Sequence, residues 1–187
     1  MEFVDPIKDI KYISAIKKEL RNNSQRDVLL FVFGINTGIR VSDLLSLKVS
    51  HVWDGKSMKE FLYIKDGKGK ETKAFFLNNS IKQELESYLH QHDLRDSDYL
   101  FKSKKDNLPI SRQQAYRIIH NAARKVGVEG KVGTHTLRKT FGYHAYRKGI
   151  AISILMFIYN HHTPGDTLRY IGIDKEDKKL VKVDVNL

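Results

Sequence analysis

The stretch Thr134-His135-Thr136-Leu137-Arg138-Lys139-Thr140-Phe141 sets a histidine three residues before an arginine. A His-x-x-Arg pair alone is a weak signal, because about 0.4 such pairs are expected by chance in a chain of this composition. A second pair, His144 and Arg147, is indeed present, and we interpret it as two neighbours on a helix surface. The residues that flank the first pair, and its distance from a tyrosine further along the chain, therefore decide its meaning.

Other segments extend the pattern on both sides. Tyr159-Asn160-His161 is followed nine residues later by Tyr170, and Arg40 lies far upstream in Thr37-Gly38-Ile39-Arg40-Val41-Ser42-Asp43. Together with the first stretch they supply a phenol, two imidazoles and two guanidinium groups at spacings that suit attack on a phosphodiester. A tyrosine oxygen that attacks phosphorus forms a covalent link, and a planar guanidinium pairs with two phosphate oxygens at once. The pattern favours nucleophilic attack on a phosphodiester.

The composition favours a nucleic acid as the partner. The 187 residues include 33 Lys and Arg against 22 Asp and Glu, a formal net charge of +11. Basic side chains release condensed counterions when they meet phosphates, and a strongly basic balance is typical of nucleic-acid-binding domains. The chain contains no cysteine, which excludes disulfides, thiolate nucleophiles and cysteine-ligated zinc.

The length and the distribution of apolar residues predict one well-buried domain outside any membrane. The longest apolar run, Val28 to Phe33, is far too short to span a bilayer. The N-terminus opens with acidic residues and does not read as a secretory signal. We therefore expect a cytoplasmic protein with no membrane partner.

The hydrophobic periodicity predicts a mainly helical α+β fold, a single compact domain with a small antiparallel sheet. Residues 61–63 and 75–77 alternate apolar and polar side chains on either side of Asp66-Gly67-Lys68-Gly69, which indicates a β-hairpin. The tail over 174–187 is expected to be either an edge strand or an arm that docks on a neighbouring subunit. Helical segments are expected after Asp5-Pro6, Ser24, Ser42, Ser80 and Ser111, and over 137–147, 153–159 and 167–171.

In their order these motifs resemble the catalytic domain of the tyrosine recombinases, the family of phage-type integrases and chromosome-dimer resolvases. Residues 134–141 are similar almost throughout to the box around the family's second arginine, and residues 37–47 to the box around its first. Asp43 stands where the family more often has Glu. The resemblance runs from about Asp5 to Tyr170. It implies the family's catalytic domain over residues 1–187, without the N-terminal core-binding domain that clamps the far face of DNA.

The resemblance also implies a catalytic set. The set is Tyr170 as nucleophile, Arg40, Arg138, His135 and His161 around the scissile phosphate, with His135 also as proton shuttle, and Lys68 as the acid that protonates the leaving 5′-oxygen.

Two members of this set have alternatives. Lys70 and Lys73 are close rivals of Lys68, and His162 is a lesser alternative to His161. The chain departs from the family at Asn160, where a Gly is usual, and at Phe75-Phe76-Leu77, which replaces Val-Pro-Leu.

By the same resemblance, the expected activity is that of a site-specific DNA recombinase or integrase that works through a covalent 3′-phosphotyrosyl intermediate. Neither a metal nor a cofactor is expected. The expected partners are double-stranded DNA, on which a solution monomer assembles as a homotetramer, and an accessory DNA-bending protein; bound to DNA, the protein is associated with the nucleoid. Two alternatives stay open, a nicking-closing enzyme similar to type IB topoisomerases and a non-catalytic DNA-binding remnant. A helix-turn-helix regulator is weaker, since it leaves Tyr170 and His161 unexplained.

Overall fold

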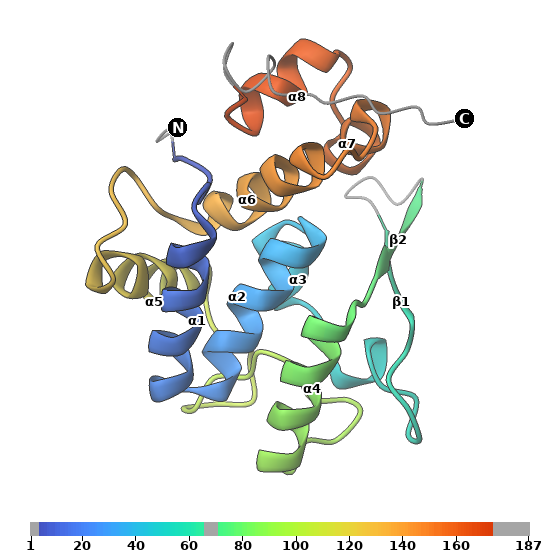
Figure 1. Cartoon of the computed structure of the whole chain (residues 1–187). Coiled ribbons are helices and arrows are strands. Elements are labelled where there is room, and N and C mark those ends of the chain that lie inside the picture. The colour runs from blue at the N-terminus through green and yellow to red at the C-terminus, as the bar shows by residue number, and fades with distance from the viewer. Residues whose placement is uncertain (1–3, 66–70, 174–187) are drawn as a thin grey trace.

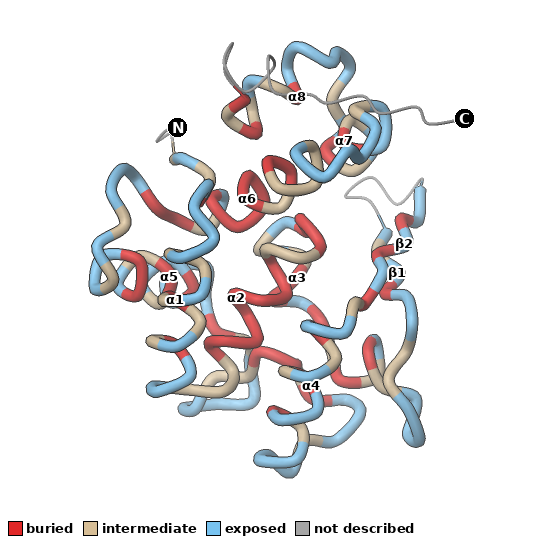
Figure 2. Tube along the Cα trace, in the orientation of Figure 1, coloured by how far each residue is buried: buried red, intermediate tan, exposed pale blue. Residues whose placement is uncertain are grey.

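Helix α2 (Gln25–Thr37) is the centre of the fold. The computed structural model describes residues 4–65 and 71–173, and within it every residue from Val28 to Phe33 is completely buried. A helix that is apolar on all sides must be covered on all sides. The cover comes mainly from α1 (Ile10–Asn23), α4 (Asn79–Gln91) and α6 (Thr134–Arg147), and Figures 1 and 2 show the buried α2 trace among them.

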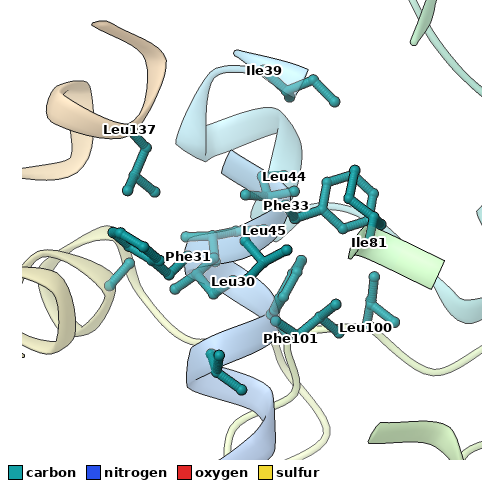
Figure 3. Close-up of a cluster of buried hydrophobic side chains, with 14 of the residues drawn as sticks. Leu30, Phe31, Phe33, Ile39, Leu44, Leu45, Ile81, Leu100, Phe101 and Leu137 are labelled. Atoms are coloured by element: carbon teal, nitrogen blue, oxygen red, sulfur yellow. The ribbon is translucent and has the colours of Figure 1, made fainter. Parts of the chain in front are cut away.

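The main hydrophobic core brings α6 directly onto α2. Figure 3 shows Leu137 projecting from α6 toward Phe31 of α2. Gly34 leaves the space for this contact, because a Cβ at position 34 would overlap the Leu137 side chain. Further along α2, the rings of Phe33 and Phe101 meet edge-to-face with their centres 6.4 Å apart. Since Leu137 lies within the His-x-x-Arg stretch, this packing fixes the place of that stretch in the fold.

A two-stranded antiparallel ribbon forms where the hairpin was predicted. It consists of β1 (Phe61–Lys65) and β2 (Thr72–Phe76), with Phe61 opposite Phe76 and Lys65 opposite Thr72. The turn between the strands, which carries Lys68 and Lys70, lies outside the described residues, as does the tail over 174–187. The ribbon and the surrounding helices confirm the mainly helical α+β fold.

The remaining helices also form, some with shifted ends. The helices expected after Ser42 and Ser80 both form but begin earlier, at Val41 and Asn79, because Arg40 and Asn78 occupy the N-cap positions. In α4 the Asn78 side chain accepts a hydrogen bond from the backbone of Ile81, which closes the first turn earlier than Ser80 would. The helical elements not yet named are α3 (Val41–Leu45), a short 3-10 turn (Val49–His51), α5 (Arg112–Lys125), α7 (Ile152–Tyr159) and α8 (Pro164–Tyr170).

The expected helix start at Asp5-Pro6 is wrong as well. Helix α1 begins at Ile10, and its N-cap is Asp9, whose carboxylate accepts a hydrogen bond from the Lys11 backbone at 2.8 Å. The described residues before it form no helix and are bonded to α6, where the Ile7 amide donates to the Thr140 hydroxyl at 2.9 Å. Tertiary contact with α6 therefore overrides the local helix signal.

A second, smaller apolar cluster joins α6 to α7 and α8. Its closest approach is at Gly142, where a Cβ would overlap both the Tyr159 hydroxyl and the Ile171 side chain. The cluster is formed by Tyr143, Leu155, Tyr159, Ile171 and Ile173.

None of the helices among the described residues is long and apolar enough to cross a membrane.

Gly142→Ala tests this close approach. We expect a loss of about 1–2 kcal/mol in the free energy of unfolding, because overlap with two side chains outweighs the roughly 1 kcal/mol of helix propensity that alanine regains. The matched control is Gly165→Ala in α8, where the added Cβ meets only the Thr163 hydroxyl at 3.9 Å, an ordinary contact. Equal denaturation midpoints for the two variants in urea would contradict the assignment.

Candidate active site

Arg138 is buried at the junction of three elements, with 6% of the residue exposed. Its guanidinium donates to the carbonyl of Gly38, at the end of α2, and to that of Ile158 in α7, the latter at 3.0 Å. The group lies 4.4 Å from the ring centre of Tyr159, whose hydroxyl donates in turn to the Arg138 carbonyl at 2.9 Å. Arg138 therefore holds the end of α2, α6 and α7 together and also supplies positive charge to the site.

Tyr170, the last residue of α8, faces this guanidinium. Burial raises the pKa of the Tyr170 phenol, whereas the charge of Arg138, a hydrogen bond with it and the charge of Arg40 lower that pKa. The Tyr170 ring meets the His161 ring edge-to-face with centres 5.2 Å apart, and the Lys139 amino group lies 5.2 Å from the Tyr170 ring centre. The phenol thus stands among cationic groups, as its predicted role as nucleophile requires.

His161 reaches the site through a sharp turn at Asn160. Asn160 ends α7 in the left-handed conformation, with φ at 57°, and the His161 amide closes the turn by donating to the Met156 carbonyl at 3.0 Å. Asparagine is the residue other than glycine that most readily adopts this conformation, so Asn160 keeps the backbone that Gly would give. Partial burial lowers the pKa of His161, as does the charge of Arg138.

His135 and Arg40 lie on the open side of the site. His135, in the first turn of α6, is exposed. Its pKa is nevertheless lowered, mainly because part of the ring loses hydration and secondly because of the charge of Arg112. Arg40 follows the left-handed turn at Gly38 and is also exposed. No described residue forms a hydrogen bond or ion pair with the Arg40 side chain, which lines a shallow depression beside Arg138. This side of the site is open and positively charged.

Of the six predicted residues, five are therefore grouped together. Lys68 lies outside the described residues. The grouping combines a buried arginine, an exposed arginine, two histidines of lowered pKa and a tyrosine from four separate parts of the chain. Within the described ranges, no three acidic or histidine side chains come together as they would around a metal ion.

Comparison with known proteins decides the family. The model of the phage integrase family matches residues 8–177. The chain belongs to this family. The probable integrase/recombinase YoeC of Bacillus subtilis is 44% identical over 176 residues, which cover 94% of this chain and 93% of that protein. The tyrosine recombinase XerA of Pyrococcus furiosus is 30% identical over 95% of this chain, but this chain spans only 59% of its length.

Solved structures of family members share the fold. The crystal structure of XerA recombinase superimposes with a TM-score of 0.77 at 22% identity, over 95% of this chain and 62% of that chain. The XerH recombinase, bound to its difH substrate in a post-cleavage complex, gives 0.75 at 19% identity over 93% and 51%. The structure of this chain therefore has the architecture of the family's catalytic domains, as the resemblance implied.

Lys73 is buried and hydrogen-bonded, whereas a lysine that protonates a leaving group is expected to have its amino group available to the substrate. The residue is 7% exposed, and its amino group donates to the Phe157 carbonyl and to the Asn160 side chain, 4.5 Å from the centre of the Phe157 ring. Lys73 thereby ties the hairpin to the turn that carries His161. Asn160, a departure from the family's Gly, thus supplies an acceptor that glycine lacks.

Several residues of the site were missed from the sequence. Arg112 and Lys139 add positive charge near His135 and Tyr170, Tyr159 covers the Arg138 guanidinium, and Thr167 touches His161. Lys139 and Tyr159 offered a local signal, since both stand inside the quoted stretches, beside Arg138 and close to His161. His144, of the second His-x-x-Arg pair, contacts the Ile7 carbonyl through Nε2 at 2.9 Å and so fastens the N-terminal segment.

The two arginines should differ in their effect on stability. We expect Arg138→Ala to lower the free energy of unfolding by about 3 kcal/mol, because it leaves the carbonyls of Gly38 and Ile158 without their charged donor. Arg40→Ala should change it by less than about 0.5 kcal/mol, as is usual for an exposed side chain. Urea unfolding followed by circular dichroism measures both, and equal losses would contradict the structural role of Arg138.

Proposed function

We propose that this protein cuts and rejoins DNA as a site-specific recombinase, with Tyr170 as the nucleophile. The observation that carries the proposal is the place of the Tyr170 ring, 5.2 Å from the His161 ring centre and 5.2 Å from the Lys139 amino group, where the charge of Arg138 also lowers the pKa of the phenol. The Tyr170 oxygen attacks phosphorus, the bond from phosphorus to the 5′-oxygen breaks, and a 3′-phosphotyrosyl link forms. Because one phosphodiester replaces another, the bond energy is kept for religation.

The remaining residues stabilise charge and move protons in this scheme. Arg138 and Arg40 face the non-bridging oxygens, where negative charge grows as phosphorus becomes five-coordinate. His161 donates to a phosphate oxygen. The phenol proton passes to His135, whose lowered pKa leaves it neutral and able to accept a proton near pH 7.

Lys68 is our candidate for the acid that protonates the leaving 5′-oxygen. The amino group of Lys73, its rival, is already bonded to Phe157 and Asn160, which supports a positioning role for that lysine. Lys70 stays the alternative. We propose that this scheme needs no metal, since the two guanidinium groups supply the positive charge that a metal ion would supply elsewhere.

Double-stranded DNA is the proposed substrate. The net charge of +11 favours it, and XerH and a lambda integrase dimer were both solved on DNA sites. We propose a monomer in solution that assembles as a tetramer on two DNA sites in the cytoplasm, with an accessory DNA-bending protein. Relaxation of supercoiled DNA without recombinant product would favour the nicking-closing activity of a type IB topoisomerase instead.

Tyr170→Phe tests the nucleophile. The variant should form no SDS-stable protein–DNA adduct on a library of nicked duplexes, while its affinity for DNA stays within about threefold, because only the attacking oxygen is lost. Sequencing of the DNA captured by the wild-type protein identifies the target site. A normal yield of adduct from the variant would exclude Tyr170.

Arg40→Ala tests transition-state stabilisation without disturbing the fold. We expect adduct formation to slow at least about 100-fold, as when a single oxyanion donor is removed. Arg40→Lys retains the charge but not the planar fork, and should recover only part of the rate. An unchanged rate for Arg40→Ala would show that the exposed guanidinium does not contact the phosphate.

A substrate with sulfur at the 5′-bridging position tests the lysine. Because a thiolate leaves without needing a proton, this substrate should restore cleavage by Lys68→Ala. Lys73→Met should stay slow on both substrates, since its defect lies in the position of the hairpin and the His161 turn. Restoration of Lys73→Met alone, or of Lys70→Ala alone, would move the acid to that residue.

A further inference from the structure

The side chain of Thr167 makes a contact that the scheme above does not use. Thr167 lies in α8 three residues before Tyr170 and is completely buried. Its hydroxyl oxygen is 3.0 Å from Nδ1 of His161 and 3.4 Å from the Thr163 carbonyl oxygen. A hydroxyl has a single proton, so the two distances decide which partner receives it.

The distances favour donation to the histidine. Hydrogen bonds from a hydroxyl to an oxygen usually measure 2.5–3.0 Å, and the 3.4 Å contact with Thr163 is beyond that range. Donation across the shorter contact gives the Thr167 proton to Nδ1 of His161, and a nitrogen that accepts this bond is the unprotonated one of a neutral ring.

We propose that Thr167 is a positioning residue that holds His161 in the tautomer with its proton on Nε2. The proposal rests on the function proposed above, in which His161 donates a hydrogen bond to the scissile phosphate. A neutral imidazole has one N–H group, and only a proton on Nε2 is available to a phosphate while Nδ1 faces Thr167.

The surroundings of His161 are consistent with a neutral ring in the absence of DNA. Burial lowers its pKa, the charges of Arg138 and His162 act in the same direction, and the Asp166 carboxylate opposes them. The ring packs against both Tyr159 and Tyr170, with ring centres 5.5 and 5.2 Å away, and these two rings are themselves 5.2 Å apart. These aromatic contacts hold the plane of the ring but do not select its tautomer; the Thr167 hydroxyl does.

The first test is the rate of adduct formation for Thr167→Val and Thr167→Ser, on the DNA that the wild-type protein selects. Valine has the shape of threonine without the hydroxyl, and we expect a loss of about tenfold, the value of one lost hydrogen bond of moderate strength. Serine keeps the hydroxyl and should stay within about twofold of wild type. A serine variant as slow as the valine variant would overturn the proposal.

A double-mutant cycle separates positioning from packing. If Thr167 acts through His161, Thr167→Val should cause no further loss in the His161→Ala background. A loss of the same size in both backgrounds would show that Thr167 only supports α8, and would overturn the proposal.

The second test does not depend on activity. In the DNA-free protein, the nitrogen chemical shifts of the imidazole distinguish the two tautomers, and the His161 signals are those that vanish in His161→Ala. Wild type and Thr167→Ser should carry the proton on Nε2, and Thr167→Val should show a mixture. A proton on Nδ1 in wild type refutes the role of Thr167, whereas absence of any adduct from wild type, with the tautomer as expected, refutes only the proposed function.

Discussion

The site depends on the burial of a positive charge at Arg138. Removing a guanidinium from water is costly unless hydrogen bonds replace its hydration. Here the replacements are neutral, namely the carbonyls of Gly38 and Ile158 and the ring of Tyr159. They come from the end of α2 and from α7, so one side chain fixes three elements relative to one another. No described carboxylate neutralises Arg138, and a bound phosphate would supply that missing negative charge.

The same buried charge also acts on Tyr170, against the effect of burial. Burial disfavours the phenolate, while Arg138 and Arg40 favour it. The pKa of the phenol is raised on balance, so in the scheme proposed above Tyr170 needs a proton acceptor before it can attack. Gly142 serves this arrangement from a distance, because only a residue without a side chain lets Tyr159 and Ile171 approach α6 so closely.

Departures from local rules are explained by contacts between distant segments. Asp5-Pro6 is a sound helix-start signal, yet the Ile7 amide bonds to Thr140 and the helix begins at Ile10 instead. Asn160 stands in a conformation that favours glycine, and its side chain accepts a hydrogen bond from Lys73, 87 residues away in sequence. In each case a tertiary hydrogen bond offsets a modest local preference.

From the sequence alone follow the mainly helical fold, the hairpin, the basic charge, and a candidate set of which the described members lie together. These follow because hydrophobic period, turn residues and motif order are local properties of the chain. Tertiary structure alone decided that Arg138 also holds the fold together, that Lys73 is anchored, and that Thr167 meets His161. Such roles depend on which atoms packing brings within hydrogen-bonding distance, and Arg138 and Gly38 are 100 residues apart in the chain.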